Sequence, residues 1–567
     1  MESQLSDEFQ RQADLAVQIR RETTVPEFSE REKIILLRVF SNIDRNTYFI
    51  YGLPEELVTA LLARYSRIKN PRGLRGLFLD DFVTNLPVIG KIFTDPDGYI
   101  REYGDRAMSR VPVEELEKLM GMGFSLSYYG SIVTVEKIKD FLRKFLDDYG
   151  HNSIARMGIV HLAVENISIL AAKTIEWARP GAGYIELSTR FVDMGVRSVY
   201  PAWRFFEGLE VKDGYVKQHI LGCMDSYQRL YPICKAYFEN EFREFQPNKA
   251  AITGKVSDSL GNLLPCATLT SLGVSMMGEA YQSVVRHLLA DENPECHALA
   301  LEIVNEARKT GNAVLLSTHY QPSLYDYLPY EIRLDFPYDL AQNLRPDIFV
   351  QRQFITPNAL ALESIIKMSG KNISEEFLDA EKLFGELNDK RNTKHESYEK
   401  LPDWFEHASA IFSGQMSFRS WRDLQRMGFC THKRGWVTPN KGVYLSPDMP
   451  REFINEYARL HLEERLLFSS DITTSMARFH MLAQYAYMMG NFVPFIVGAN
   501  LREWEFVNWQ RSKWGVNEEV RKVVLKAEEF LRYEYPWWKR ISRADMTWEY
   551  IFARGGKAIP SKNKISN

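Results

Sequence analysis

The sequence has only five cysteines among its 567 residues, and none of them forms a Cys-x-x-Cys pair. A disulfide framework or a thiolate zinc site is therefore not expected, and this usage is typical of a reducing, cytoplasmic compartment. A run of about 18 apolar residues, long enough to span a membrane, is also missing. The nearest candidate, residues 485–501, is interrupted by Gly490, Asn491, Pro494 and Asn500. The charged N-terminus has no apolar core of the signal-peptide kind.

Neither sign of charge is in large excess. Lys plus Arg number 71 and Asp plus Glu number 74, which gives a net charge of −3. A surface that holds nucleic acid through its phosphates needs a marked basic excess, so no nucleic-acid partner is expected, and no membrane partner either. A small anionic ligand stays open, because a few local arginines can bind one. The sequence also lacks the motifs of zinc proteases, P-loops and glycine-rich dinucleotide turns, and we expect no metal site.

The residues that are present indicate a folded protein of more than one domain. Hydrophobic residues make up 45% of the chain, aromatic residues 13% and charged residues 26%, as in ordinary globular proteins. A single hydrophobic core stops growing at roughly 250–300 residues, so two or three units are expected.

Helical periodicity dominates the sequence. It predicts helices over residues 29–39, 54–65, 112–120, 135–146, 159–177, 296–309, 359–368, 374–387, 453–467, 474–489, 502–513 and 518–532. Strand-like runs are fewer and shorter, at residues 47–51, 197–201, 349–355 and 408–412. We therefore predict a helix-rich α+β fold.

The order of these signals returns after residues 318–347, a stretch rich in Pro and Tyr. Ala63-Arg-Tyr-Ser66 is echoed by Ile366-Lys-Met-Ser369, and the helices expected within 274–309 are echoed within 497–532. Such an internal repeat indicates a tandem duplication, although the residue identities are weak. The predicted parts are a helical extension (1–40), a first repeat (41–317), a connector (318–347), a second repeat (348–545) and a polar tail (546–567).

One candidate anion site follows a Gly-rich turn at residues 179–183. Its sequence is Glu186-Leu-Ser-Thr-Arg-Phe191, in which a Ser hydroxyl, an Arg fork and turn N–H groups suit a phosphate. The alternative is a helix-capping Ser beside a surface Glu–Arg pair.

The second half carries two groups of arginines. Arg419, Arg422 and Arg426 share one face of an expected helix, either as an anion site or as a solvated basic face. Arg502 and Arg511 lie nine residues apart on an aromatic-rich helix, where the alternative is surface arginine packed on aromatic rings. A Cys nucleophile needs an activating base or cation, and Cys296 directly precedes His297, but inert buried thiols are favoured over nucleophiles.

In the first half, Gly150-His-Asn-Ser153 and the Glu186–Phe191 segment resemble two signatures of the flavin-dependent thymidylate synthases. Ser66 and Ser369 fall at an early Ser that contacts the flavin in that family. The first half departs from the family at Ala178-Arg-Pro180, where the family has Arg-His-Arg. It departs again on a late helix, where Met277, Glu279 and Leu288 occupy the places of the family's Asn, Arg and Arg.

The second half resembles the same family at the complementary places. Phe405-Glu-His407 matches, as do Asn500-x-Arg502 and Arg511 nine residues further on. Arg426 keeps the first Arg of Arg-His-Arg, but the Glu-x-Ser-x-Arg signature is lost in residues 431–436. The resemblance therefore implies two diverged tandem repeats of the synthase type that form a pseudo-dimer.

The resemblance also implies a function: reductive transfer of a one-carbon unit from a folate to C5 of dUMP, with FAD as cofactor and NADPH and methylenetetrahydrofolate as co-substrates. The expected site is a composite of both repeats, and the expected assembly is a homodimer. By position, Arg511 would be catalytic. The residues matched to nucleotide contacts are Glu186, Leu187, Ser188, Thr189, Arg190 and Arg426. Those matched to the cofactor are Ser153, Glu186, Arg426, Asn500, Leu501 and Arg502.

Two other functions fit the same sequence. The scaffold could act on another pyrimidine nucleotide or one-carbon donor, since the second and third residues of Arg-His-Arg are lost in both halves. It could also be a non-catalytic nucleotide- or flavin-binding assembly protein. Flavin content separates the last reading from the enzymes, and product analysis separates the two enzymes.

Overall fold

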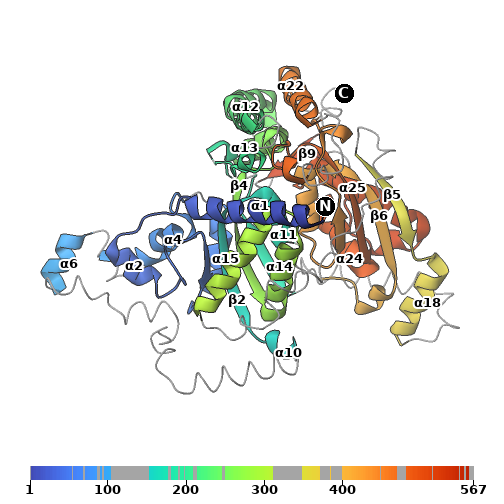
Figure 1. The fold of residues 1–567 in the computed structure, drawn as a ribbon. Helices are drawn as coiled ribbons and strands as arrows, with labels where there is room; N and C mark the ends of the chain where they lie inside the picture. Colours follow the sequence, from blue (N-terminus) through green and yellow to red (C-terminus); the bar gives the residue numbers. More distant parts are fainter. Residues whose placement is uncertain are drawn as a thin grey trace. The chain divides into compact units, whose positions relative to one another are not determined.

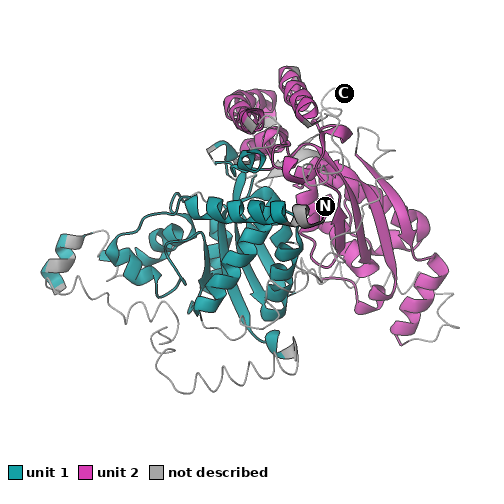
Figure 2. Ribbon diagram, viewed as in Figure 1, with its two compact units in different colours: residues 1–211, 267–334 teal, residues 212–266, 335–567 magenta. Residues whose placement is uncertain are grey.

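The structure is a computed structural model of the 567-residue chain. It describes residues 2–53, 55–67, 70–85, 90–91, 95–103, 152–176, 181–189, 192–196, 198–207, 213–245, 249–310, 348–370, 384, 399–446, 449–468, 481–513, 515–547, 550–554 and 557–560. The chain forms two compact units (Figures 1 and 2). Unit 1 comprises residues 1–211 and 267–334, and unit 2 comprises residues 212–266 and 335–567.

Unit 1 is built around a four-stranded antiparallel sheet of order β1-β2-β4-β3. Its strands are β1 (Thr47–Ile50), β2 (Ile159–Ser168), β3 (Ala182–Glu186) and β4 (Leu269–Met277). Its helices are α1 (Glu2–Glu22), α2 (Glu30–Leu36), α3 (Glu55–Tyr65), α4 (Gly73–Phe78), α6 (Pro96–Tyr103), α10 (Asn152–Ala155), α11 (Ile169–Ile175), α14 (Gly278–Ala290) and α15 (Pro294–Thr310). A π-helix, η1 (Leu79–Val83), follows α4, and two 3-10 helices, η4 (Met194–Val196) and η5 (Ala202–Phe206), follow β3.

Both faces of this sheet are buried. Leu162 and Val164 of β2 join a core with α11, α14 and α15 on one face. Ala163, between them in the sequence, joins a second core with α2, α3 and α4 on the other. Alternate side chains of a strand point to opposite faces, so apolar residues stand at consecutive positions where a strand lies between two cores.

Unit 2 has a sheet of the same strand order, β5-β6-β8-β7, again antiparallel. Its strands are β5 (Phe349–Ile355), β6 (Ser409–Ser417), β7 (Thr431–Arg434) and β8 (Phe492–Asn500), with a separate hairpin of β9 (Tyr550–Arg554) and β10 (Lys557–Pro560). Its helices are α12 (Asp213–Glu241), α13 (Lys249–Leu260), α18 (Asn358–Met368), α21 (Phe418–Gln425), α22 (Arg451–Phe468), α24 (Leu501–Ser512), α25 (Glu518–Glu534) and α26 (Trp538–Ile541). Short 3-10 helices lie at η6 (Arg243–Phe245), η7 (Gly261–Leu263), η11 (Asp403–His407) and η12 (Pro439–Lys441).

The same buried cap recurs in each unit at the end of the second strand. In unit 1 the Ser168 hydroxyl caps α11, and its N–H and O–H both donate to Glu295, at 2.8 and 2.6 Å. In unit 2 Ser417 caps α21 and donates in the same way to Glu519. The Asn two residues before each Glu accepts from that Glu N–H, at 3.0 Å from Asn293 and 2.8 Å from Asn517. The cap therefore ties strand, short helix and long helix together in each unit.

The helix-rich α+β class is confirmed, and several helices and strands lie as predicted. Strand β5 has the predicted bounds, and α18, α22, α24 and α25 begin and end within two residues of theirs. The predicted helix over 159–177 is wrong, because residues 159–168 form β2 and only 169–175 are helical. Residues 269–277 likewise form a strand, and 197–201 contribute only an isolated bridge at Val199.

The remaining predictions concern four helices and segments and the boundaries of the two repeats, and the structure tests only some of them. Of the helix predicted over 474–489, the structure describes residues 481–489. Residues 481–483 are helical, but residues 484–489 form turns and a bridge, so the helix ends earlier than predicted. The helices predicted at 112–120 and 135–146, and the connector at 318–347, lie outside the described residues. Residues 212–266 cluster with unit 2 rather than with the rest of the first half. The boundaries of the repeats stay predictions.

The five cysteines are all free and buried, as expected for inert thiols. Burial raises the pKa of the Cys266 thiol, which disfavours its nucleophilic thiolate form. Among the described residues, no helix combines the length and apolar composition needed to cross a membrane.

Candidate functional site

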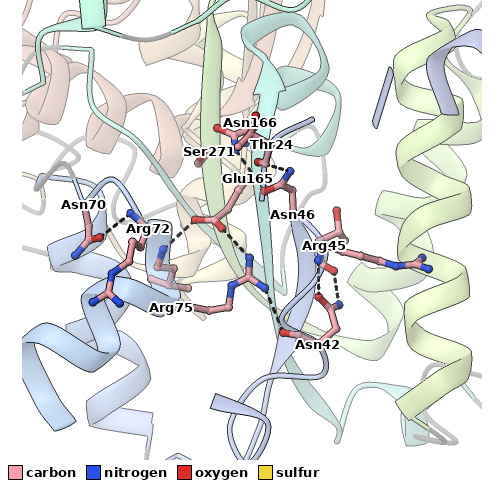
Figure 3. A network of polar contacts seen from close by, with 12 residues as sticks. Thr24, Asn42, Arg45, Asn46, Asn70, Arg72, Arg75, Glu165, Asn166 and Ser271 are labelled. Atoms are coloured by element: carbon pink, nitrogen blue, oxygen red, sulfur yellow. Dashed lines mark hydrogen bonds and ion pairs between the residues drawn. The ribbon is translucent and has the colours of Figure 1, made fainter. Parts of the chain in front are cut away.

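Unit 1 contains a cavity of about 180 Å³ that is lined by residues of α3, α4, β2 and β4 and of the loops beside them. Six polar residues line it: Thr24, Tyr65, Asn70, Glu165, Asn166 and Ser271. Pro26, Pro71, Gly73 and Leu187 complete the lining. Many of the polar groups belong to one network of contacts (Figure 3).

The Glu165 carboxylate is the central charged group of this cavity. It is only 3% exposed, and its Oε1 accepts hydrogen bonds from the Tyr65 hydroxyl at 2.5 Å and the Leu74 N–H at 2.9 Å. The nearest cation is Arg75, whose Nη2 lies 3.9 Å from Oε2. Gly73 has φ +69°, and a Cβ there would lie 2.3 Å from Glu165 Oε1. Glycine is therefore required for the carboxylate to sit where it does.

A β-bulge places Glu165 at the cavity. The pairing of β2 with β4 shifts register between Val164 and Ile167, and Asn166 has φ +54°. Arg20 Nη1 donates to the carbonyls of Glu165 and Asn166, at 3.0 and 2.9 Å. The Asn166 N–H donates to the Ser271 hydroxyl at 3.2 Å. A left-handed residue held by so many contacts is the kind of local strain that gathers at functional sites.

The Glu186–Arg190 segment runs beside the same cavity. Leu187 lines it and donates its N–H to the Ser271 carbonyl at 3.0 Å. The Ser188 N–H donates to the Ser66 carbonyl, also at 3.0 Å. Two segments that the family resemblance assigns to nucleotide and flavin contacts, separated by more than one hundred residues, are thus brought together.

Glu186 is not the surface residue of the alternative reading. It is 6% exposed and pairs at 2.8 Å with Lys173, which also pairs with Glu176. One buried ammonium therefore serves two buried carboxylates. Burial, together with the Glu176 charge, raises the pKa of nearby Tyr184, so this phenol stays protonated.

In unit 2, Arg502 of α24 meets the Phe405-Glu-His407 segment. Its Nη1 pairs with Glu406 Oε1 at 2.7 Å, and its Nε donates to the Leu401 carbonyl at 2.6 Å. Asn500 caps α24, its Oδ1 accepting from the Glu503 N–H at 2.9 Å. Leu501 is buried and donates its N–H to the Ala408 carbonyl.

The three arginines of α21 do not form a solvated basic face. Arg419 and Arg422 are each 5% exposed, and Arg419 Nη2 pairs with Asp258 at 3.1 Å. Arg422 Nη1 lies 3.6 Å from the Met489 sulfur. Arg426, the C-cap residue, is exposed. Only Arg426 therefore stands where a soluble ligand reaches it readily.

Arg511 lies in the last turn of α24 and is partly buried. Two other cations lie over the Trp509 ring, Lys513 at 3.6 Å and Arg543 at 4.2 Å from its centroid. Thr189 is partly buried, next to Ser188. Gly150, His151, Arg190 and the Ser153 side chain lie outside the described residues.

Guanidinium and amide N–H groups of unit 2 are donors of the kind that phosphate and carbonyl oxygens accept from. Within the described part of the chain, Arg502 Nη2, Asn500 Nδ2 and the Arg426 guanidinium have no hydrogen-bond partner. The Arg502 side chain is 35% exposed. The cavity of unit 1 is smaller than the roughly 300–1,000 Å³ of typical ligand pockets, so it does not hold a dinucleotide by itself.

Sequence reasoning missed Glu165, Tyr65, Gly73 and Arg75. Glu165 was hidden inside a predicted helix, and its partners come from a segment about one hundred residues earlier. The only signal was indirect: Tyr65 belongs to the Ala63–Ser66 echo. The cavity was therefore not predicted.

A family model described as thymidylate synthase complementing protein matches residues 111–310. This match confirms the resemblance of the first-half motifs, Gly150–Ser153 and Glu186–Phe191, over about a third of the chain. The matched range contains the Glu186–Arg190 segment, Glu165 and Ser271.

Three curated relatives are UPF0159 proteins. The one from Chlamydia pneumoniae is 30% identical over 50% of this chain and 48% of its own length, so the chain matches about half of it. The one from Chlamydia muridarum is 24% identical over 89% of this chain and 93% of its own. The one from Thermoplasma acidophilum is 22% identical over 71% and 87%.

A solved structure found by fold comparison is a UMP/dUMP methylase, PolB from Streptomyces cacaoi, bound with 5-Br UMP. It is 16% identical, with a TM-score of 0.26, over 35% of this chain and 97% of that one. At this score, neither the fold nor the chemistry of the present chain follows from the likeness.

Proposed function

We propose that this chain, which resembles the thymidylate synthase complementing proteins, is an enzyme that transfers a one-carbon unit reductively from a folate to C5 of dUMP. The proposed cofactor is FAD, and NADPH and methylenetetrahydrofolate are the proposed co-substrates. The observation that carries the proposal is the family match over residues 111–310, which includes the Glu186–Arg190 segment. When bound, a flavin supplies hydride.

The roles proposed for this chain's residues follow from the motifs and their surroundings. Residues 186–190 and Ser153 are proposed to bind nucleotide and cofactor groups in the first half. In the second half, Arg426, Asn500, Leu501 and Arg502 are proposed to bind cofactor or nucleotide. The unengaged N–H groups of Arg426, Asn500 and Arg502 support this, since guanidinium and amide donors suit phosphate and carbonyl oxygens.

We propose further that the two halves are diverged repeats. Two observations support it, the common strand order of the two sheets and the recurring Ser–Glu–Asn cap. Each half retains motifs that the other has lost. Residues of both halves would then contribute to one composite site that binds the nucleotide and the cofactor.

Replacing Arg502 by alanine is expected to weaken FAD binding about ten- to a hundredfold. The change removes a charge-assisted hydrogen bond, for which about 1.5–3 kcal/mol is typical. The measurement is a fluorescence titration of the apoprotein with FAD.

Two matched variants complete that experiment. Glu406→Gln removes the carboxylate that competes for Arg502 and is expected to leave FAD affinity unchanged or higher. Arg459→Ala, on an exposed face of α22, controls for a general loss of positive charge. Unchanged FAD affinity in Arg502→Ala would remove Arg502 from the cofactor site.

One flavin per chain is expected, not two, because neither half has the complete set of motifs. Two chains are expected to associate, as the family's multi-subunit site implies. Released flavin per mole of chain and the mass of the native particle give both numbers. Two flavins per chain would contradict shared use of the two halves, and a strict monomer would contradict the homodimer. A colourless protein that binds no FAD would overturn the enzymatic proposal itself.

A further inference from the structure

Three polar side chains of unit 1 form one chain of contacts on the face of its sheet that α3 covers. His161 of β2 and Ser275 of β4 stand opposite each other in the ladder, and His161 Nδ1 lies 2.8 Å from the Ser275 hydroxyl oxygen. Gly273, two residues before Ser275, faces Leu62 of α3. The other ring nitrogen of His161, Nε2, lies 3.2 Å from Oε1 of Glu55, the first residue of α3. A hydroxyl, an imidazole and a carboxylate from three separate elements are therefore linked.

The direction of the two hydrogen bonds follows from the chemistry of the groups. An ionised carboxylate only accepts hydrogen bonds, so the nitrogen that faces Glu55, Nε2, carries the ring proton. In the neutral ring Nδ1 is then an acceptor, and the Ser275 hydroxyl donates to it. In this tautomer an imidazole can remove the proton of a serine hydroxyl, while the carboxylate holds the ring in place. The three groups are therefore arranged as an activated nucleophile requires.

Space for a reacting group lies beside the Ser275 hydroxyl. The residue opposite Ser275 in the edge strand β3 is Gly183, which is exposed. Side chains at directly opposite positions of a ladder point to the same face of the sheet. Among the residues that the structure describes, a Cβ added at Gly183 would have one heavy atom within 4 Å beyond its chain neighbours, the Ser275 carbonyl oxygen at 3.9 Å. The missing side chain of Gly183 therefore leaves room next to the partly buried serine.

Exposed apolar side chains flank this space. Ile159 and Met277 are opposite each other at the end of the ladder, two residues beyond the His–Ser pair and on the same face. They are 58% and 38% exposed, and a Cβ at Gly181 would lie 3.3 Å from the Met277 sulfur. The Met277 side chain therefore lies over the turn that leads into β3. A short apolar chain attached to the reacting group would lose its contact with water on these two side chains.

The strand order that the two units share does not require the His–Ser contact. The N-cap residues of α14 and α24 pair with the first residues of β2 and β6. Counted two residues along each strand from those pairs, His161–Ser275 corresponds to Ile411–Gly498 in unit 2. The count ends before the bulge of β2, so the extra residue there does not affect it. A sheet of this order thus forms without an imidazole or a hydroxyl at this place.

We propose that Ser275, His161 and Glu55 form a nucleophilic site that hydrolyses carboxylic esters with a short apolar acyl group. The Ser275 oxygen attacks the ester carbonyl carbon, and its proton passes to His161 Nδ1. The bond from that carbon to the alcohol oxygen then breaks, and the alcohol leaves with the proton, which gives an acyl-serine. Water that loses a proton to the same nitrogen attacks the acyl group, and the acid leaves as Ser275 takes the proton back. Glu55 touches no reacting atom and is a positioning residue.

The first test is hydrolysis of p-nitrophenyl butyrate by the full chain, followed by the absorbance of the released nitrophenol. Because Gly183 is exposed, water reaches the oxyanion, and the general base is expected to supply most of the acceleration, typically about a hundred- to ten-thousandfold. Ser275→Ala is therefore expected to lower kcat/KM at least about a hundredfold. Ser364→Ala, a partly buried serine of α18, is the matched control and is expected to change nothing.

The second test needs no variant and does not depend on the choice of ester. An alkyl fluorophosphonate reacts with an activated serine: an oxygen–phosphorus bond forms, the phosphorus–fluorine bond breaks, and fluoride leaves while the hydroxyl proton passes to the base. Peptide mass spectrometry of the labelled full chain is expected to find the adduct on Ser275. His161→Ala is expected to slow this labelling at least about a hundredfold, because it removes the base.

Glu55→Gln tests the positioning role. The glutamine amide can donate to His161 Nε2, which favours the tautomer with the proton on Nδ1, and that nitrogen can then no longer accept from Ser275. Accordingly, kcat is expected to fall at least about tenfold, with KM little changed. Glu56→Gln, the next and also exposed carboxylate in the first turn of α3, is the matched control and is expected to leave both constants unchanged.

Three results would overturn the proposal: hydrolysis by Ser275→Ala at the rate of the parent, a fluorophosphonate adduct that is absent or lies on another residue, or an unchanged kcat in Glu55→Gln. The assays contain no flavin, NADPH or folate. A chain without esterase activity can therefore still transfer one-carbon units, and a chain that binds no FAD can still hydrolyse esters, so the two proposals fail separately.

Discussion

Glu519→Ala is expected to destabilise unit 2 by about 2–6 kcal/mol. The carboxylate is 1% exposed and accepts both the N–H and the hydroxyl of Ser417 at the start of α21. Removing it leaves two buried donors without an acceptor, each of which costs about 1–3 kcal/mol. Urea unfolding followed by tryptophan fluorescence measures the loss, since Trp421 and Trp504 are buried in this unit.

Glutamine at the same position separates charge from hydrogen bonding. Burial raises the pKa of Glu519, although the Ser417 donors act in the opposite direction, so the negative charge itself is not what stabilises the cap. Glu519→Gln keeps one acceptor and is expected to cost clearly less than alanine. Glu529→Ala, a partly exposed carboxylate on the same helix, serves as the control and is expected to change stability by less than about 0.5 kcal/mol.

The equivalent change in unit 1 tests the recurrence of the cap. Glu295→Ala removes the same pair of bonds from Ser168 and is expected to destabilise that unit by a similar amount. A neutral Glu519→Ala together with a costly Glu295→Ala would show that the two caps carry unequal weight despite their common geometry.

One part of the fold that sequence predicted is the amphipathic helix α25. It presents a buried face and an exposed one that includes Lys526 and Tyr533. Strand β2 was misread because both of its faces are buried, which erases the period-two alternation. A run with consecutive buried apolar residues, such as Leu162-Ala-Val164, reads equally as part of a buried helix, and only the pairing with β4 decides.

Part of the candidate site could be predicted from the sequence, and part could not. Motifs carried by neighbouring residues, such as Asn500-x-Arg502, could be found from sequence, and the structure adds their partner Glu406. The cavity could not be found, because Glu165 receives its donors from Tyr65 and Leu74 about ninety to one hundred residues away. Nor could burial be read from charge, since Arg419 and Arg422 lie in the core of unit 2.

Arg511→Lys is expected to lower the turnover of the proposed methyl transfer by about a hundred- to a thousandfold, with a much smaller effect on dUMP affinity. The family resemblance places Arg511 near the pyrimidine carbonyl, where negative charge develops during the reaction. The planar guanidinium fork suits a delocalised oxygen, and an ammonium point charge does not reproduce it. Loss of one such donor typically costs about 2.7–4 kcal/mol in the transition state.

The split between rate and affinity is what distinguishes this role from a structural one. Single-turnover rates and dUMP binding are measured on the flavin-loaded enzyme, with Arg459→Lys, an exposed arginine of the same unit, as the matched control. Trp509 is already covered by Lys513 and Arg543, so replacing Arg511 leaves these two aromatic contacts in place. If Arg511→Lys turns over as fast as the parent, the pyrimidine is activated by another group. If dUMP affinity falls while the single-turnover rate at saturating dUMP is unchanged, Arg511 binds the substrate equally in the ground and transition states and contributes nothing specific to the transition state.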